Sequence, residues 1–330
     1  MVPGSWAFQM RDFFRFLSRH GVVLVTALVV LVAIVVLMGR SSAPEQPQTG
    51  ADDSPLVVVG TFSLIGDWLR EVGGEHIDLR VLTPVGAEVH EWELQPRNFI
   101  DLESADLVFY NGMMLEQWMR QVAVAVGEDV PLIGLAERSD YPVQHIITGD
   151  YSGEPDPHMW MDPRAVVEYV GVIARTLAEH DPANAASYEA RAHAYIDQLK
   201  ALHQEMTDKF AAIPETARVL ITSEAAFPYF AKAYDFFHDG IWGNNAEVEG
   251  SPRQIMRITG VIEERRPAAV FWESTISDRY VKGVARDTGV EVAGPLYVDS
   301  LGPAGSGAET YLKMMRHNAR LIVEALGESS

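Results

Sequence analysis

Four potential metal ligands in this sequence follow strand-like segments or lie in a stiff loop. Ligands of open α/β sheets bind beyond the carboxyl ends of the strands, which makes side chains at these places the first candidates for a site. Two precede and two follow a long helical segment, so two imidazoles and two carboxylates could hold one metal ion between two lobes. They are His90 after LRVLTPVGAEV, His158 in EPDPHMWMDP, Glu224 after VLIT, and Asp299 after VAGPLYV.

The two histidines also have simpler explanations. His90 lies in VHEWEL, an alternating stretch in which a half-exposed surface histidine is common. Leu94 stands where the zinc protease motif H-E-x-x-H needs its second histidine, so that motif is absent here. Pro155 and Pro157 restrict the backbone before His158, which suits a preorganised ligand and a merely stiff connection equally well.

The carboxylates have alternatives as well. Glu224 could cap a helix that begins near Ala225, because carboxylates favour the positive N-terminal ends of helices. Asp299 precedes the turn-rich SLGPAGSG, where an aspartate often bonds its own backbone. Glu273, after the strand-like AAVFW, competes with Asp299 as a strand-end carboxylate, and spacing alone does not separate the two.

The amino-acid composition limits the kinds of metal site and partner that this protein can have. The sequence contains no cysteine, which excludes disulfide scaffolds, thiolate zinc sites, iron–sulfur clusters and cysteine nucleophiles. Lysine and arginine number 26 against 46 aspartates and glutamates, a formal charge of -20 that disfavours nucleic acid as a partner and tends to attract cations. A metal ion in this protein must therefore be held by nitrogen and oxygen.

Residues 1–54 predict an export signal or a membrane anchor followed by a linker. Three arginines precede the uncharged apolar run Val22–Met38, which just reaches the length needed to span a bilayer. Small residues after the run would suit a signal peptidase, which leaves cleavage open. The arginines on the near side place the rest of the chain outside the cytoplasm.

From Pro55 on, short β-branched runs alternate with helical patterns, which predicts an α/β fold with mainly parallel sheets flanked by helices. Helices are expected between the strands, for example over 64–72, 118–125 and 252–265. The expected strands are 56–60, 78–82, 107–110, 130–134, 219–222, 268–272 and 291–295.

The middle of the chain breaks this alternation. Residues 163–212 carry no strand signal, and helical spacing is maintained from about Pro182, with Asp181 as a start signal and Pro214 as a stop. We expect one long helix over 182–213, bridging an N-terminal lobe over 55–181 and a C-terminal lobe over 214–330. A cleft between two lobes is a favoured place for a small ligand.

At these residues the chain resembles the metal-binding solute receptors of ABC importers for manganese, zinc and iron, the cluster A-I family. The likeness spans about Val57 to Leu326, and it implies two α/β lobes bridged by one long rigid helix, with an ion in the cleft between them. It also implies His90, His158, Glu224 and Asp299 as the ligands, and a structural role for Glu273. It rests on segments such as GTFSLIGDWLREVGG, VLTPVGAEVHEWELQP, ADLVFYNGMMLEQW, DPHMWMDP, TSEAAFPYFAKAYDF, IWGNNAEVEGSPRQI and GPLYVDSLGPAGSGAETYLKMMRHN.

The resemblance also suggests which metal is bound. Zinc receptors of this family usually have histidine at the third ligand position and often a histidine-rich loop, whereas manganese and iron receptors have glutamate. Here the third residue is Glu224, and His145 is the only histidine between the first two ligands. Two carboxylates that can each bind through both oxygens suit Mn(II) or Fe(II) better than tetrahedral Zn(II). We expect Mn(II), with Fe(II) or Zn(II) as the alternatives.

Two positions depart from the family pattern. Many relatives are lipoproteins tethered through a cysteine that this sequence lacks, which leaves the 22–38 run as the visible tether. Glu88 and Val89 replace the usual Asp-Pro before the first histidine.

The expected function is a non-enzymatic receptor that delivers Mn(II) or Fe(II) to an ABC permease. A zinc receptor of the same family is the first alternative, and an exported metallohydrolase is the second. The hydrolase is disfavoured because four protein ligands leave little room for a bound water, and because neither H-E-x-x-H nor G-x-S-x-G occurs.

Overall fold

The computed structural model describes residues 54–327 of the chain. The apolar run over 22–38 lies outside the described residues, and its role as signal or anchor stays a prediction. Among the helices of residues 54–327, none combines the length and apolar character needed to cross a bilayer. Residues from Pro55 on group into one compact unit.

The first sheet has four parallel strands in the order β2-β1-β3-β4. Three of its strands, LVVVG, LVFY and LIG, are almost entirely apolar, as expected for a parallel sheet covered on both faces, whereas the edge strand IDLRV alternates apolar and charged residues. The elements of this part are β1 Leu56–Gly60, α2 Ser63–Gly73, β2 Ile77–Val81, α3 Pro96–Glu103, β3 Leu107–Tyr110, α4 Met119–Val126 and β4 Leu132–Gly134.

The second sheet repeats this design with the order β6-β5-β7-β8, again all parallel. The prediction of two lobes with mainly parallel sheets flanked by helices is confirmed. The elements are β5 Val219–Glu224, α7 Pro228–Tyr234, β6 Phe237–Trp242, α8 Pro252–Arg265, β7 Ala269–Glu273, α9 Arg279–Thr288 and β8 Glu291–Leu296.

Strand β6 is the strand that the sequence analysis failed to predict. Its sequence FHDGIW carries polar residues and a glycine, so it does not look like a strand in isolation. In the fold, Asp239 is buried and pairs with Arg257 of α8 at 2.8 Å. Tertiary contacts thus compensate for the polar residue in the strand.

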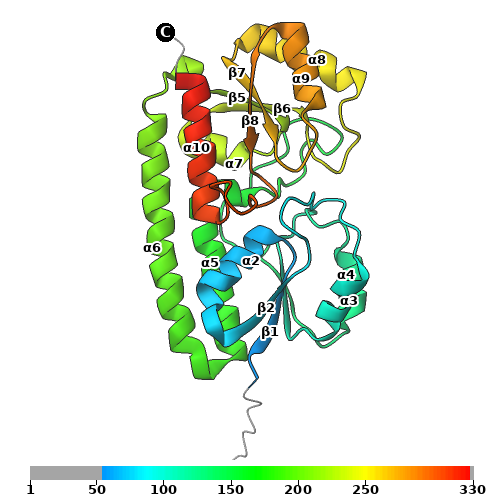
Figure 1. Cartoon of the computed structure of the whole chain (residues 1–330), viewed down its shortest axis with the longest axis vertical. Helices are drawn as coiled ribbons and strands as arrows, with labels where there is room; N and C mark the ends of the chain where they lie inside the picture. The colour runs from blue at the N-terminus through cyan, green and yellow to red at the C-terminus, as the bar shows by residue number, and fades with distance from the viewer. Residues whose placement is uncertain (1–53, 328–330) are drawn as a thin grey trace, which may run out of the picture. The chain divides into compact units, whose positions relative to one another are not determined.

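One long helix, α6, runs along both lobes, with helix α5 beside it next to the first sheet and helix α10 beside it next to the second sheet (Figure 1). The three helices are α5 Pro163–His180, α6 Ala185–Phe210 and α10 Tyr311–Gly327. Helix α6 packs against α5 and α2 of the first lobe and against α10, which follows the second sheet. This helix is the predicted long connection, although the exact lobe boundaries at 181 and 213 stay a prediction.

Most buried apolar residues form one core that continues from the first sheet through α5 and α6 into the second lobe, and a second cluster lies between the second sheet and helices α8 and α9. Phe210 at the end of α6 packs edge-on against Phe230 and Phe236, with ring centroids 5.2 and 5.3 Å apart. Aromatic pairs of this geometry stabilise the packing beyond what their buried area contributes, so they hold the second lobe firmly on α6.

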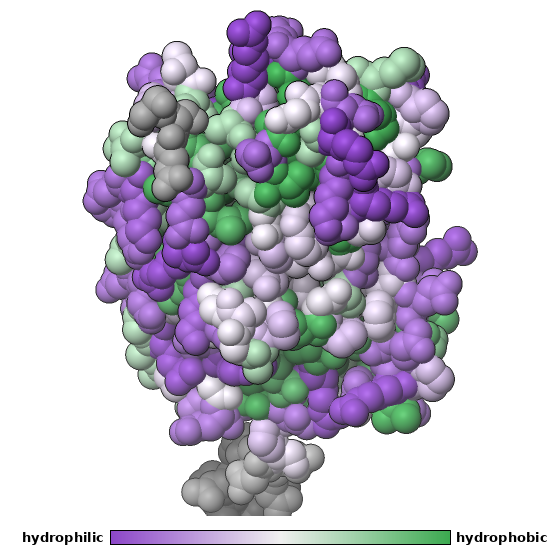
Figure 2. All heavy atoms as spheres, turned by 45° about the horizontal axis from the view of Figure 1, so that its top comes forward, coloured by the Kyte–Doolittle hydropathy of each residue, from purple (hydrophilic) through white to green (hydrophobic). Residues whose placement is uncertain are grey.

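Hydrophilic side chains cover much of the face in Figure 2, with apolar ones scattered between them.

Candidate metal centre

Four side chains from distant parts of the sequence converge on one point in the interior. His90, His158, Glu224 and Asp299 each offer a nitrogen or oxygen atom, and these atoms lie within 4.8 Å of one another. All four residues are at most 1% exposed. The structure therefore brings together the four residues that the sequence analysis named as candidates.

Each carboxylate faces both imidazoles. His90 Nε2 lies 3.8 Å from Glu224 Oε1 and 3.7 Å from Asp299 Oδ2. His158 Nε2 lies 3.5 Å from Glu224 Oε2 and 3.5 Å from Asp299 Oδ1. These separations exceed those of ordinary hydrogen bonds and leave the two rings and two carboxylates around a common centre.

The segments that present these side chains come from both lobes. Glu224 is the last residue of β5, and Asp299 follows the end of β8, so both lie at the carboxyl edge of the second sheet. His90 lies between β2 and α3, and His158 lies just before α5. The indole of Trp160 donates to the carbonyl of Val298 at 3.0 Å, which ties the His158 loop to the Asp299 segment.

Several atoms that face this centre are buried without a hydrogen-bond partner. They include Nε2 of both histidines, Oε2 of Glu224 and Oδ1 of Asp299. A buried polar atom without a partner costs about 1–3 kcal/mol, so four of them at one point are unfavourable unless a ligand satisfies them. A divalent cation fits this donor set, because it would bind two neutral imidazoles and two carboxylates at once.

His90 is held through its backbone. Glu88 Oε1 accepts the His90 N–H at 2.8 Å, and the Trp118 indole donates to the carbonyl of Val89 at 2.7 Å. The residues Glu88 and Val89, which depart from the family pattern, therefore still position the first histidine. The alternative of a half-exposed surface histidine at position 90 is wrong, because this side chain is fully buried.

The local capping explanation of Glu224 is also wrong. Helix α7 begins at Pro228 with Phe227 at its N-cap, so Glu224 ends a strand and does not cap this helix. Its Oε1 accepts the backbone N–H of Asn245 at 2.8 Å instead. Asp299 Oδ2 likewise accepts from the Asn245 side chain at 3.3 Å.

Glu273 lies beside the centre and supports it. Its Oε1 accepts the backbone N–H of Glu224 at 2.8 Å, and its side chain is fully buried. Among residues 54–327, the group of converging metal-competent atoms contains Asp299 and does not contain Glu273. In the structure Asp299 is therefore the candidate ligand, and Glu273, which sequence spacing could not distinguish from it, is a supporting residue.

Two more buried acids, Glu88 and Glu273, lie close to the charged carboxyl groups of the centre and have raised pKa values. Burial raises the pKa of Glu88 to about 9, and the nearby Asp299 and Glu224 carboxylates add to this rise. Burial and the charges of Glu224 and Asp299 also raise the pKa of Glu273 well above its usual range. Near neutral pH Glu88 therefore keeps its proton, and the shift at Glu273 likewise favours its neutral form.

The His158 ring and the surrounding carboxylates stabilise each other's charged forms. Burial acts to lower the pKa of His158, but the Glu224 and Asp156 carboxylates outweigh it and the net pKa is raised. Burial acts to raise the pKa of Asp299, but the His158 and His90 rings hold it below its usual value. A cation that binds here takes the place of the proton on His158.

Sequence reasoning assigned no supporting role to three residues that hold the ligands, Asp156, Asn245 and Glu88. Asp156 stands two positions before His158, a spacing that lets a carboxylate reach the backbone of the histidine, and this was the one available signal. Asn245 lies in IWGNNAEVEG, and nothing in that segment shows which of two adjacent asparagines faces the carboxylates.

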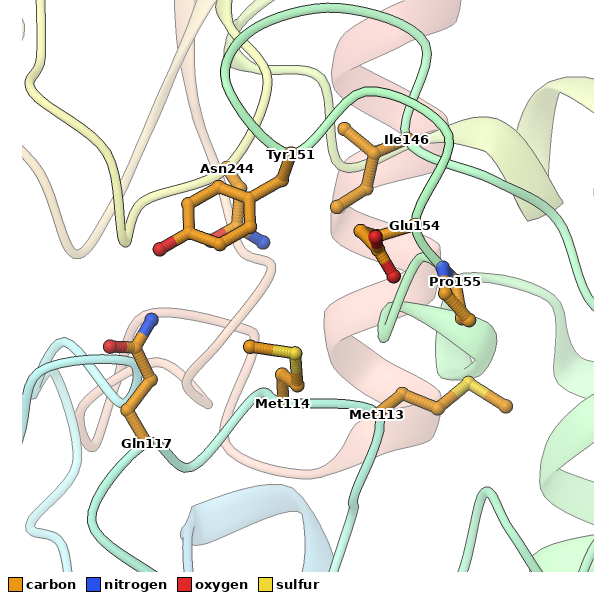
Figure 3. Close-up of a pocket in the computed structure, with 8 residues that line it drawn as sticks. All are labelled: Met113, Met114, Gln117, Ile146, Tyr151, Glu154, Pro155 and Asn244. Carbon is orange, nitrogen blue, oxygen red and sulfur yellow. The ribbon is translucent and has the colours of Figure 1, made fainter.

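A separate pocket of about 210 Å³ is lined mainly by residues from the segments 113–117 and 146–155 (Figure 3). Met114 and Gln117 face Tyr151 and Asn244 across it. Met113 and Met114 adopt positive φ angles of 50° and 63°, and Glu137 accepts the Met113 N–H at 2.9 Å. None of the four converging side chains lines this pocket; its link to the centre is the position of Asn244 next to Asn245.

Comparisons with known proteins find metal-binding relatives of this chain. The family described as zinc-uptake complex component A, periplasmic, matches residues 58–325. The manganese-binding lipoprotein MntA of Halalkalibacterium halodurans is 36% identical over 298 residues, covering 90% of this chain and 97% of that protein. The iron-binding protein YfeA of Yersinia pestis is 37% identical over 272 residues, covering 82% and 86%.

Solved structures show the same fold. The periplasmic zinc binding protein TroA of Treponema pallidum has a TM-score of 0.77 and 28% identity, covering 83% of this chain and all of that one (100%). The Mn-bound periplasmic metal binding protein of Candidatus Liberibacter asiaticus has a TM-score of 0.75 and 27% identity, covering 82% and 99%.

Proposed function

Because the chain belongs to the family of the zinc-uptake complex component A, periplasmic, we propose that it captures Mn(II) or Fe(II) outside the cytoplasm and delivers the ion to an ABC permease. The observation that carries the proposal is the convergence of His90, His158, Glu224 and Asp299, with unpartnered, buried donor atoms on all four. The relatives named for manganese and iron binding support the choice of a divalent transition metal.

The donor set favours Mn(II) or Fe(II) over Zn(II). Both oxygens of Glu224 and of Asp299 face the imidazoles, so each carboxylate can bind through both oxygens and raise the coordination number above four. Zinc prefers a tetrahedral arrangement but binds most nitrogen and oxygen sites more tightly than manganese. Selection of manganese therefore depends on the metals available as well as on the site.

Two carboxylates balance the charge of a divalent ion. The resulting neutral site can be buried at lower cost than a charged one, which suits an interior position. Location outside the cytoplasm follows from the predicted export segment over 22–38 and the positive-inside rule. The permease partner is inferred from the family.

We infer a receptor and not an enzyme. A metal-dependent hydrolase needs an open coordination position for water, and four ligands with up to six donor atoms occupy the ion's coordination sphere. Hydrolase assays of the purified protein with added Mn(II) test this inference. Substrate turnover that disappears in His158→Ala would overturn it.

The metal-binding proposal is tested by elemental analysis and calorimetric titration. Protein produced in medium with balanced manganese, iron and zinc is expected to contain about one ion per chain, mostly manganese or iron. His158→Ala is expected to lose this ion, whereas His193→Ala, on an exposed position of α6, is expected to retain it. Equal metal content in both variants would contradict the site.

A further inference from the structure

Asn245 contacts both carboxylates of the proposed metal site. Its backbone N–H donates to Glu224 Oε1 at 2.8 Å, and its side-chain Nδ2 donates to Asp299 Oδ2 at 3.3 Å. The residue is 4% exposed and follows the end of β6. A single residue thus holds one oxygen of each carboxylate.

The orientation of the Asn245 amide is determined by Trp242. The Trp242 indole Nε1 donates to Asn245 Oδ1 at 2.8 Å. Because an indole N–H can only donate, the amide oxygen must face Trp242, and the amide nitrogen must face Asp299. The indole is itself fully buried and packs edge-on against Tyr280 at 5.7 Å, so it cannot easily move.

This arrangement controls the rotation of the two carboxylates. Each presents one oxygen to His90 and the other to His158, which is the orientation that binding through both oxygens requires. A carboxylate oxygen that accepts one N–H still has a lone pair for a metal ion. The oxygens held by Asn245 therefore remain able to bind.

We propose that Asn245 is a positioning residue that holds Glu224 and Asp299 in the orientation for binding through both oxygens, and so favours ions with more than four ligands. This inference rests on the proposed function and goes beyond it, because it assigns part of the metal preference to a residue that does not touch the ion. Without the side-chain donor, Asp299 rotates and binds through one oxygen.

The test compares Asn245→Ala with Asn244→Ala in the full chain, purified in a mild detergent. Asn244 is a matched control because it is also buried, and its side chain accepts the Ala246 N–H instead of contacting a carboxylate. Trp242→Phe is a second variant, which keeps Asn245 but removes the donor that orients its amide. Affinities for Mn(II) and Zn(II) are measured by competition, and Co(II) reports the coordination number through its visible absorption.

Loss of a residue that supports metal ligands typically costs ~10- to 100-fold in affinity. We expect a loss of that size for Mn(II) in Asn245→Ala, with a smaller loss for Zn(II), which needs only four donors. The Co(II) bands should become more intense, as expected for a lower coordination number. Trp242→Phe should change both readouts in the same direction, and Asn244→Ala should match the wild type.

The outcomes separate this inference from the proposed function. A wild-type protein that binds none of Mn(II), Zn(II) or Co(II) overturns the function itself. A wild-type protein that binds them, while Asn245→Ala keeps the wild-type Mn(II)-to-Zn(II) ratio and Co(II) spectrum, overturns the inference alone. Should Asn245→Ala fail to fold, Trp242→Phe decides by the same two readouts.

Discussion

Asp156 accepts two hydrogen bonds from His158 through the single oxygen Oδ1, one from the backbone N–H at 2.9 Å and one from ring Nδ1 at 3.0 Å. A carboxylate only accepts, so the ring proton lies on Nδ1 and the lone pair of Nε2 points at the proposed metal. The pair orients the histidine before an ion arrives.

Replacing Asp156 with alanine should lower Mn(II) affinity ~10- to 100-fold, because the ring loses the partner that fixes its orientation and its protonated nitrogen. Calorimetric titration measures the change. Asp150→Ala, an exposed position in the same loop, serves as the control and should bind as the wild type does. Unchanged affinity in Asp156→Ala would show that the ring is positioned by other contacts.

Glu224→His should shift metal preference toward zinc, because three imidazoles and one carboxylate make a softer donor set with fewer oxygens. Elemental analysis of protein from balanced medium should show a higher zinc-to-manganese ratio than the wild type. Glu215→His, at an exposed position, controls for the added histidine. If the wild type already carries zinc and Glu224→His does not differ from it, the residue does not control the choice.

Asp67 should make the folded protein less stable as the pH rises. Burial raises its pKa to about 6 from 3.8, although the Tyr311 N–H that it accepts at 2.8 Å opposes the rise. A raised pKa gives stability that is fully present below the unfolded value of 3.8 and is lost as the pH passes about 6. The loss amounts to up to about 3 kcal/mol.

Urea unfolding of Asp67→Asn at about pH 4 and about pH 7 tests this. Asparagine keeps an oxygen for the Tyr311 N–H but cannot ionise, so the wild type should lose more stability than the variant between the two pH values. Asp287→Asn, at an exposed position, should follow the wild type. Parallel curves for Asp67→Asn and the wild type would refute the assignment.

Gly240→Ala should displace the backbone that carries Glu224. A Cβ at position 240 would lie 2.3 Å from the Ala225 nitrogen and 2.5 Å from the Glu224 carbonyl carbon, both backbone atoms. The strand carrying Glu224 would have to move, at a cost of ~1–3 kcal/mol and with weaker Mn(II) binding. Thermal unfolding and titration measure both effects.

Gly260→Ala on α8 is the matched control, because a Cβ there meets nothing within 4 Å. Alanine is favoured over glycine inside a helix by roughly 0.5–1 kcal/mol, so this variant should be slightly more stable and bind normally. A Gly240→Ala protein with wild-type stability and affinity would mean that β5 and β6 can separate without moving Glu224.

Much of the fold was predictable from local patterns. Uninterrupted β-branched runs such as Leu56–Gly60 identify buried parallel strands, because both of their faces must be apolar. Strand β6 was not predictable, because its Asp239 becomes acceptable in a strand only through Arg257, which lies on another element. Propensity describes a residue alone, and this pairing exists only after folding.

The sequence by itself determined the kinds of donor available, two imidazoles and two carboxylates with no thiol, and it placed them at the ends of strands and in a stiff loop. Only the tertiary structure decided that Glu224 is a buried member of this group and not a helix cap, because its neighbours Asn245 and Glu273 come from the loop after β6 and from the end of β7. Local sequence cannot convey such contacts, since hydrogen bonds between distant segments depend on how the whole chain packs.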